Sequence, residues 1–461
     1  MSEGISPANT VFVLLSFEGP DIYSMVGGLG VRMTELSRAL AHCGFDAHLF
    51  FVGDPTKPGY EVGEHGHWHL HRWGQWLSAS YPEGVYHGEE DKMADYESSL
   101  PPHLIDEIIR PAVQRGRTCI VLAEEWHTAS TVVALHHNLH VAGMRERCII
   151  YWNANNTYGF WRIPWNALSN ASILTTVSRY MKHKMWSYGL NPLVIPNGIP
   201  ARLLHPPAPD RVAALRGLFE AEAEATGIAP GPLIAKVGRF DTDKRWMMAI
   251  DALHVLHASP YGSVHRPRMI VRGGTEPHRV DVMGRAAMHG LRWAEVTVND
   301  PTPDRIMTAL SRHLDADILE LRFFVPEDFL HTIYAAADAV FANSGHEPFG
   351  LVGLEVMASG GIAFTGCTGE DYAQSFHNAV VVDSEDAREM AVYVIDLMTH
   401  TEEKQRIRRN AQETAKMFTW DEVLKALCRK LEFSAQVGGV AFQPCGRPAL
   451  GGACDAGPLA I

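Results

Sequence analysis

Apolar runs that resemble strands alternate with helical stretches along most of the chain, in two consecutive series. The first series begins with the apolar run Thr10–Phe17, which ends at a Gly/Pro turn, and continues with helical periodicity over Gly28–His42 and a second run at Asp46–Val52. Strand, turn, helix and strand in this order predict a βαβ unit with parallel strands. The other expected strands are 118–123, 148–153 and 171–177 in the first series, and 233–237, 268–272, 295–298, 319–325, 339–343, 362–365 and 379–382 in the second. The sequence therefore predicts an α/β fold with two doubly wound domains of the Rossmann-like kind.

The two series are separated by residues 195–200, whose Ile-Pro-Asn-Gly-Ile-Pro sequence is typical of a turn and is followed by a Pro/Ala-rich stretch that we interpret as a linker. We expect an N-terminal domain over 1–200, a C-terminal domain over 201–417 and a last helix over 418–436. The Gly, Pro and Ala content of 437–461 predicts a disordered tail. Two domains joined by one hinge predict closure on a ligand.

The composition excludes several classes of partner. The net charge of −13 disfavours nucleic acid and anionic membranes, because no basic stripe offsets the repulsion. No apolar run is long enough to span a bilayer, and the acidic first residues lack the features of a signal peptide. These observations, with seven cysteines and no paired CxxC spacing, predict a cytoplasmic protein without a transmembrane segment.

Two carboxylates, Glu347 and Glu355, stand eight residues apart across a Pro/Gly-rich turn. Apolar residues then recur at helical spacing from Leu351, so the segment predicts a loop that runs into a buried helix N-terminus. Exposed amides and the helix dipole at such an end favour a phosphate near 350–352. Eight residues at helical rise place the two acids up to roughly 12 Å apart. This span suits a ligand made of a sugar, a diphosphate and a ribose.

Two glycine turns follow expected strands. Residues 27–30, Gly-Gly-Leu-Gly, follow the first strand and begin a helix, which favours either a ligand cradle or a plain tight turn. In the second series, Gly238 is followed by Arg239 and Lys244, which would lie where a diphosphate docks, and a solvated helix start is the alternative. Neither turn has the GxGxxG spacing of a dinucleotide fold.

His127 follows an expected strand directly and stands at a helix start. A lone histidine is usually structural, but this position predicts an imidazole that points into a ligand cleft and bonds a sugar hydroxyl or a phosphate.

Alternating histidines at 65, 67, 69 and 71 share one face of an extended segment, which raises the question of a metal. No carboxylate or cysteine joins them, and an exposed hairpin explains the pattern equally well, so we expect no metal site. The insertion that carries them also holds aromatic residues at 73, 76, 81 and 86 and acids at 89–91. These side chains suit carbohydrate recognition, although an aromatic cluster under a long loop is the commoner arrangement.

Taken together, these motifs resemble the retaining glycosyltransferases of family 4, within the GT-B superfamily and the glycosyl transferases group 1. The segments that carry the resemblance are 27–30, 126–129, 176–178, 196–199, 238–240 with Lys244, and 347–355, the last being the most specific. The resemblance implies that Glu355 binds the donor ribose, that Glu347 contacts the donor sugar and that Arg239 and Lys244 hold the diphosphate. It also implies a final helix that crosses back to the first domain.

The implied reaction is transfer of a sugar, with retention, from a nucleoside-diphosphate-sugar substrate to a carbohydrate or other hydroxylated acceptor, without a metal or cofactor. The resemblance implies catalytic roles for Glu347, His127, Arg239 and Lys244, and donor contacts from Gly27, Gly28, Gly238, Arg239, Lys244, Glu347, Phe349, Gly350, Leu351 and Glu355. Met25 stands where glycogen and starch synthases place a lysine, which argues against a polymer synthase of that kind. The alternatives are a sugar phosphorylase or nucleotide-sugar epimerase of the same fold, or a non-catalytic sugar-binding protein. A nicotinamide oxidoreductase is disfavoured because neither half has GxGxxG.

Overall fold

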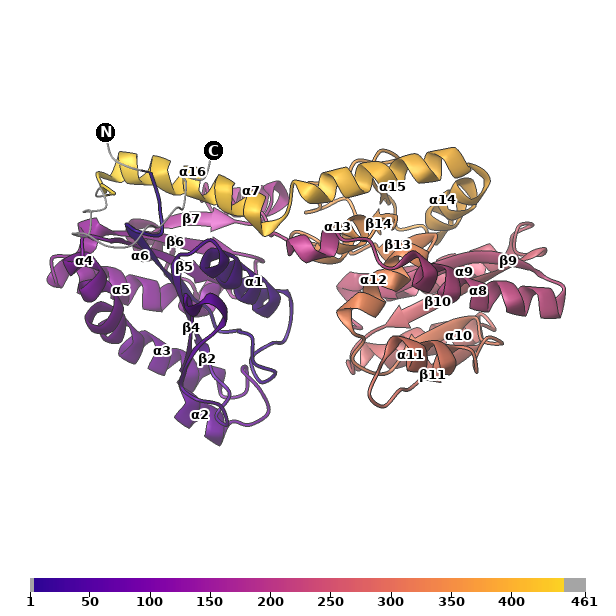
Figure 1. The fold of residues 1–461 in the computed structure, drawn as a ribbon, viewed down its shortest axis with the longest axis horizontal. Helices are drawn as coiled ribbons and strands as arrows, with labels where there is room; N and C mark the ends of the chain where they lie inside the picture. Colours follow the sequence, from indigo (N-terminus) through magenta and orange to yellow (C-terminus); the bar gives the residue numbers. More distant parts are fainter. Residues whose placement is uncertain (1–3, 443–461) are drawn as a thin grey trace, which may run out of the picture. The chain divides into compact units, whose positions relative to one another are not determined.

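The computed structural model describes residues 4–442. The chain forms two compact units. Unit 1 comprises the residues up to Gly198 together with those from Trp420 onward, and unit 2 comprises Ile199–Thr419. Each unit is built on one sheet with helices on both faces (Figure 1).

Unit 1 holds an eight-stranded sheet in the order β3-β4-β2-β1-β5-β6-β7-β8. All neighbours are parallel except β3, which pairs with β4 antiparallel. The strands are β1 Thr10–Leu15, β2 Asp46–Val52, β3 Tyr60–Val62, β4 Trp68–Trp73, β5 Thr118–Glu124, β6 Cys148–Ala154, β7 Ile173–Thr176 and β8 Leu193–Val194. Strands β1, β5 and β6 are buried throughout, as expected for a parallel sheet covered on both faces.

The helices of unit 1 divide between the two faces of the sheet. They are α1 Gly28–His42, α2 Gln75–Ser80, α3 Glu89–His103, α4 Arg110–Gln114, α5 Ala129–Val141, α6 Trp165–Ala171, α7 Arg179–Trp186 and α16 Trp420–Gly438. Leu36 and Leu40 of α1 and Leu427 of α16 share one apolar cluster with Phe12 and Leu14 of β1. Helices α3 and α5 pack against each other away from this cluster.

The last helix, α16, therefore belongs to the same unit as the first strand. Figure 1 shows the yellow end of the chain beside the indigo elements of unit 1. Trp420 packs so closely on Gly198 that a Cβ there would lie 2.6 Å from the indole. Of the segment expected to form a disordered tail, Val437 and Gly438 end α16 and Phe442 is buried in the apolar cluster, whereas 443–461 lie outside the described residues.

Unit 2 holds a seven-stranded parallel sheet in the order β11-β12-β10-β9-β13-β14-β15. The strands are β9 Ala229–Val237, β10 His265–Arg272, β11 Trp293–Val296, β12 Ile318–Leu321, β13 Ala339–Ala342, β14 Ala363–Thr365 and β15 Val380–Val381. Alternate residues of β9 face opposite layers, because Ile234 joins one apolar cluster and Leu233 and Ala235 join another.

The helices of unit 2 cover both faces of this sheet. They are α8 Pro209–Thr226, α9 Trp246–Ala258, α10 His278–Met288, α11 Pro303–Leu310, α12 Glu327–Ala336, α13 Leu351–Ala358, α14 Ala387–Thr399 and α15 Thr401–Lys416. Helices α9, α10 and α14 contribute to the cluster that holds Ile234, whereas α8, α11 and α12 contribute to the cluster that holds Leu233.

The predicted α/β class is confirmed, with local differences. The stretch after 200 that we interpreted as a linker contains the 18-residue helix α8, which begins with a proline in its first turn. Strand β11 begins two residues before the predicted position, and β8 was not predicted. Strands β3 and β4 lie in the segment for which we expected only an exposed hairpin. No helix among the described residues is both long and apolar enough to cross a membrane.

Candidate functional site

In unit 2, two loops leave the same edge of the sheet. Strands β9 and β13 are parallel neighbours, so the loops that follow them start side by side. The amide of Gly345 donates to the carbonyl oxygen of Asp243 at 2.7 Å, which joins the two loops. Gly238 begins the first loop with a φ of 149°, a conformation that favours glycine.

Lys244 and Glu347 meet across these two loops. The Nζ of Lys244 lies 2.5 Å from Oε2 of Glu347 and 3.4 Å from the Oγ of Ser344. Arg239 is placed differently: its side chain is 57% exposed, and its guanidinium lies 3.9 Å from Asp241. The structure thus brings Lys244 and Glu347 together and leaves Arg239 at the surface of the same loop.

The turn before α13 depends on a glycine. Gly350 has a φ of 82°, and a Cβ there would lie 2.7 Å from the Cγ of Glu370 and 2.9 Å from the hydroxyl of Tyr372. Phe349 is buried with its ring edge-on to Tyr372, so only its backbone is suited to a ligand. Leu351 is the first residue of α13, whose first-turn amides are free of intrahelical partners.

Glu355 lies on α13 with its side chain half-buried. Burial, together with the nearby Glu327, raises the pKa of its carboxyl to about 7. Within residues 4–442, no hydrogen bond or ion pair to this carboxylate is present. An acid that is partly desolvated and lacks a protein partner is suited to accept hydrogen bonds from hydroxyl groups of a ligand.

Sequence reasoning missed Glu370 and Thr368, which support Glu347. The Glu347 amide donates to Thr368 Oγ1 at 2.9 Å, and Thr368 Oγ1 donates back to the Glu347 carbonyl oxygen at 3.2 Å. Burial and the neighbouring Glu347 raise the pKa of Glu370 to about 8. The glycine turn after β14, residues 366–369, was the signal that could have found them.

In unit 1, the glycine turn after β1 is capped by a carboxylate that the sequence reasoning also missed. Oε2 of Glu18 accepts hydrogen bonds from the amides of Val26, Gly27 and Gly30 at 3.2, 3.0 and 3.0 Å. Tyr86, from the predicted insertion, donates to Oε1 of the same carboxylate at 2.5 Å. Gly28 is the first residue of α1. The amides of Gly27 and Gly30, which were expected to face a ligand, are therefore already bonded to the Glu18 carboxylate.

His127 lies after β5, but its imidazole does not point into an open cleft as we expected. The residue is 5% exposed, its ring stacks on Phe17 with centroids 4.5 Å apart, and the tilted ring of Trp126 lies 3.9 Å from it. Its Nε2 is 2.8 Å from Oε1 of Glu89. Burial lowers the pKa of His127, and Glu89 opposes this effect. Its Nδ1 is buried without a hydrogen-bond partner among the described residues.

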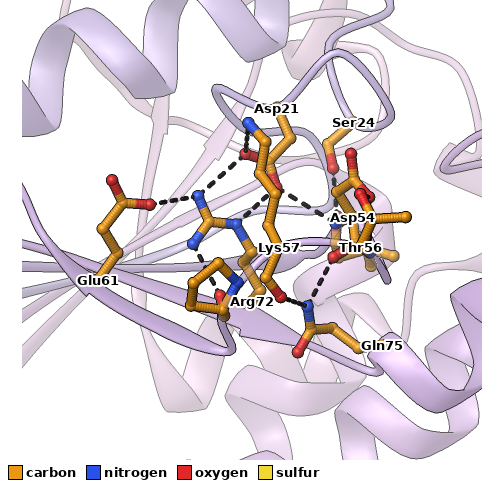
Figure 2. Close-up of polar contacts among 10 residues, drawn as sticks. Asp21, Ser24, Asp54, Thr56, Lys57, Glu61, Arg72 and Gln75 are labelled. Atoms are coloured by element: carbon orange, nitrogen blue, oxygen red, sulfur yellow. Dashed lines mark hydrogen bonds and ion pairs between the residues drawn. The ribbon is translucent and has the colours of Figure 1, made fainter.

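A buried ion pair holds the segment that leads from β1 to the glycine turn (Figure 2). The guanidinium of Arg72, on β4, binds both carboxylate oxygens of Asp21 at 2.8 and 3.1 Å and Oε2 of Glu61 at 2.7 Å. Lys57 reaches the same Asp21 at 2.9 Å, and Ser24 donates to the carbonyl oxygen of Val52. The glycine turn is thereby tied to the ends of β2 and β4.

The expected hairpin of the histidine-rich segment is present as the antiparallel pair β3–β4, but it is not exposed throughout. Strand β4 also pairs with β2, and its alternate residues Trp68, Leu70 and Arg72 are buried. His67 bonds Asp46 at 2.8 Å, whereas His69 stacks on His48 and His71 stacks on Phe50. Across residues 4–442, no group of three or more His, Cys, Asp or Glu side chains has an arrangement that could hold a metal ion.

Both halves of the chain match models of known glycosyltransferase families. The model of the Glycosyltransferase Family 4 matches residues 26–203, and the model of the Glycosyl transferases group 1 matches residues 219–414. A D-inositol 3-phosphate glycosyltransferase of Salinispora tropica is 32% identical over 111 residues, which are 23% of this chain and 23% of that relative. The aligned part thus spans about a quarter of the curated relative.

Solved structures show the same fold at low sequence identity. Sucrose-phosphate synthase of Thermosynechococcus elongatus superposes with a TM-score of 0.64 at 17% identity, over 92% of this chain and 100% of that one. The catalytic domain of starch synthase IV of Arabidopsis thaliana, bound to ADP and acarbose, gives 0.60 at 14% identity, over 93% and 99%. The fold is that of the GT-B glycosyltransferases. The chain belongs to the family 4, group 1 glycosyltransferases.

Proposed function

We propose that this chain transfers a sugar, with retention of anomeric configuration, from a nucleoside-diphosphate sugar to a hydroxylated acceptor. The observation that carries the proposal is that unit 2 holds both the Lys244–Glu347 pair and the unpartnered Glu355 carboxylate, eight residues after Glu347. A cation, the backbone amides of a glycine turn at a helix start, and two acids in one unit provide partners for a diphosphate, a sugar and a ribose.

The charges of unit 2 suit a leaving diphosphate. Lys244 and Arg239 would stabilise the negative charge that develops as the glycosidic bond breaks, and the amides at the start of α13 would add to this stabilisation. Glu347 would hold Lys244 in place before the donor binds and accept a hydrogen bond from the sugar. The departing phosphate oxygen would take the proton of the acceptor hydroxyl on the same face of the ring. No metal or cofactor is required in this scheme.

Glu355 would bind the ribose. Two ribose hydroxyls can donate to one carboxylate, and the carboxylate of Glu355 has no competing protein donor in the described part of the chain. His127 would act from unit 1 by holding Glu89 and the ring of Trp126, since its imidazole is buried beneath them.

A panel of UDP-, ADP- and GDP-linked sugars tests the proposal. We expect one base to raise the melting temperature, and that donor to be hydrolysed slowly without an acceptor and in the presence of EDTA. NMR of the product would show the anomeric configuration of the donor retained. Phosphorolysis would indicate a phosphorylase, epimer formation would indicate an epimerase, and binding without turnover would indicate a sugar-binding protein.

A further inference from the structure

Unit 1 exposes aromatic side chains at the edge of the sheet that carries His127. Tyr158 is 72% exposed and Trp161 is 84% exposed, both in the loop after β6. The ring of Tyr158 lies 6.2 Å from that of Trp126, and the guanidinium of Arg162 lies 4.3 Å from the Trp126 ring and 5.6 Å from the Trp161 ring. We call Trp126, Tyr158, Trp161 and Arg162 the aromatic platform.

The loop that presents the platform is held by specific contacts. Asn156 Oδ1 accepts from the Tyr158 amide at 2.6 Å, and the indole of Trp165 donates to the carbonyl oxygen of Phe160 at 3.0 Å. Gly159 has a φ of 71°, and a Cβ there would lie 2.4 Å from the Trp126 ring. Strands β5 and β6 are parallel neighbours, so this loop leaves the sheet beside the segment that holds His127.

Polar groups border the platform. Glu90 binds Arg162 at 2.7 Å and is mostly exposed, and Glu89 binds His127 at 2.8 Å. The indole nitrogen of Trp126 is buried without a hydrogen-bond partner in the described part of the chain, and buried donors without a partner are uncommon. Aromatic faces with carboxylates at their rim are suited to a sugar ring, whose C–H face stacks and whose hydroxyls donate.

The charges near the platform are unfavourable for a phosphate. The N-terminus of α1, which otherwise attracts anions, is bonded to the Glu18 carboxylate. The cations in this region are engaged: Arg162 binds Glu90, Arg32 binds Glu124 at 3.1 Å, and Lys92 donates to three carbonyl oxygens. A phosphorylated sugar would meet carboxylates rather than a free amide cradle.

We propose that the aromatic platform is an acceptor subsite for an uncharged sugar ring, and that Glu18 makes unit 1 discriminate against phosphorylated sugars. Tyr158 and Trp161 stack on the ring, and Glu89 and Glu90 accept hydrogen bonds from its hydroxyls. This assignment rests on the proposed function, because it supplies the acceptor of that reaction.

Saturation-transfer NMR on the full chain tests the subsite without a donor. The probes are methyl glucoside, galactoside and mannoside, alone and as their 6-phosphates. We expect at least one uncharged glycoside to bind, and its 6-phosphate to bind about tenfold more weakly or not at all. The double variant Tyr158→Ala, Trp161→Ala should lose binding by about tenfold or more, while Trp161→Phe retains it.

Trp186→Ala serves as the control, because Trp186 is a half-exposed tryptophan of α7 in the same unit. It should leave glycoside binding unchanged. Glu18→Gln keeps an oxygen acceptor for the glycine-turn amides but removes the charge, so it should reduce the discrimination against the 6-phosphates. Melting temperatures measured on each variant identify those that do not fold.

The proposal is overturned if no uncharged glycoside binds, if the 6-phosphates bind as well as the glycosides, or if the double variant binds like the wild type. Calorimetric titration of the same samples with UDP, ADP and GDP separates this failure from that of the proposed function. Nucleotide binding without glycoside binding contradicts only the subsite, whereas the absence of nucleotide binding contradicts the transferase assignment.

Discussion

In unit 2, Lys244 and Glu347 come from loops that follow two different strands and meet with Nζ and Oε2 2.5 Å apart. Both side chains are largely shielded, at 32% and 16% exposed, and Ser344 lies within 3.4 Å of the same ammonium group. Glu347 thereby holds the positively charged Lys244 ammonium at the edge of the sheet before any ligand arrives. In the proposed reaction this charge stabilises the negative charge of the departing diphosphate.

The first prediction concerns Lys244→Met. We expect the turnover number to fall about a hundredfold or more, because a preorganised charge that stabilises the leaving group is lost. The free energy of unfolding should change by only about 1 kcal/mol, since partly exposed ion pairs contribute little. Lys416→Met is the control: its surface pair with Glu413, at 2.7 Å, lies on α15, and its removal should leave turnover unchanged. Normal turnover in both variants would show that Lys244 only links the two loops and has no role in catalysis.

The second prediction concerns the pH dependence of nucleotide binding. The Glu355 carboxyl, with a pKa of about 7, is largely protonated at pH 6 and ionised at pH 8. If the carboxylate accepts from two ribose hydroxyls, the affinity for a nucleoside diphosphate should rise with pH through this range. Glu355→Gln should weaken binding by about 1.5–3 kcal/mol at pH 8 and remove the Glu355 contribution to the pH dependence. Calorimetric titration measures both effects, and an unchanged affinity at pH 8 would remove Glu355 from the donor site.

Much of the fold could be predicted from the sequence because its strands are buried on both faces. Continuous apolar runs such as Thr10–Leu15 and Thr118–Glu124 leave little ambiguity when helical stretches separate them. Short or partly exposed strands gave weaker signals. Tyr60–Val62 is exposed along its whole length, so neither its burial nor its periodicity distinguishes it from a loop.

The details of the site were less accessible because they depend on partners distant in the sequence. The sequence indicated the glycine turn at 27–30. It did not indicate that the folded chain places the Glu18 carboxylate against this turn, where it accepts hydrogen bonds from the amides of Gly27 and Gly30. His127 was found by its position after a strand, yet its burial follows from the rings of Phe17 and Trp126, which pack against it. Local sequence patterns thus identify the residues that lie at the edge of a sheet. They do not determine which distant residues those side chains and amides contact.

The third prediction concerns Glu370, whose pKa is raised to about 8. Because the folded state holds this proton more tightly than the unfolded state, the stabilising effect of the protonated acid is complete below about pH 4.5. It decreases by up to about 1.4 kcal/mol per pH unit as the pH rises toward 8. Glu370→Gln mimics the protonated acid at every pH. We therefore expect the free energy of unfolding of the variant, relative to that of the wild type, to be higher at pH 8 than at pH 5. Chemical denaturation at these two pH values measures the difference, and an equal difference at both would contradict the raised pKa.

The fourth prediction concerns the histidines of β2 and β4. The Nδ1 of His48 lies 3.1 Å from Nε2 of His71, and burial with neighbouring histidines lowers the pKa of each to about 3. A lowered histidine pKa means that the unfolded state binds protons first, so stability is complete above about pH 6.5 and decreases toward pH 3. We expect His71→Phe, which keeps the stacking on Phe50, to be less sensitive to acid than the wild type. His313→Phe, in the turn that follows α11, is the control and should match the wild type in the pH dependence of its melting curves between pH 4 and pH 7.

The last prediction concerns the buried pair of Asp21 and Arg72, which are 1% and 2% exposed in their side chains (Figure 2). Arg72→Met leaves Asp21 with only Lys57 as a charged partner and should lower the free energy of unfolding by about 3–5 kcal/mol. The double variant Asp21→Leu, Arg72→Met removes both charges and should recover part of that loss, because no uncompensated carboxylate is then buried. A double-mutant cycle by urea denaturation, with Arg110→Met at an exposed pair on α4 as the control, measures the coupling. If the double variant is as unstable as the sum of the two single variants, the pair does not act as a unit, and the glycine turn is held in place by the backbone contacts of its own loop.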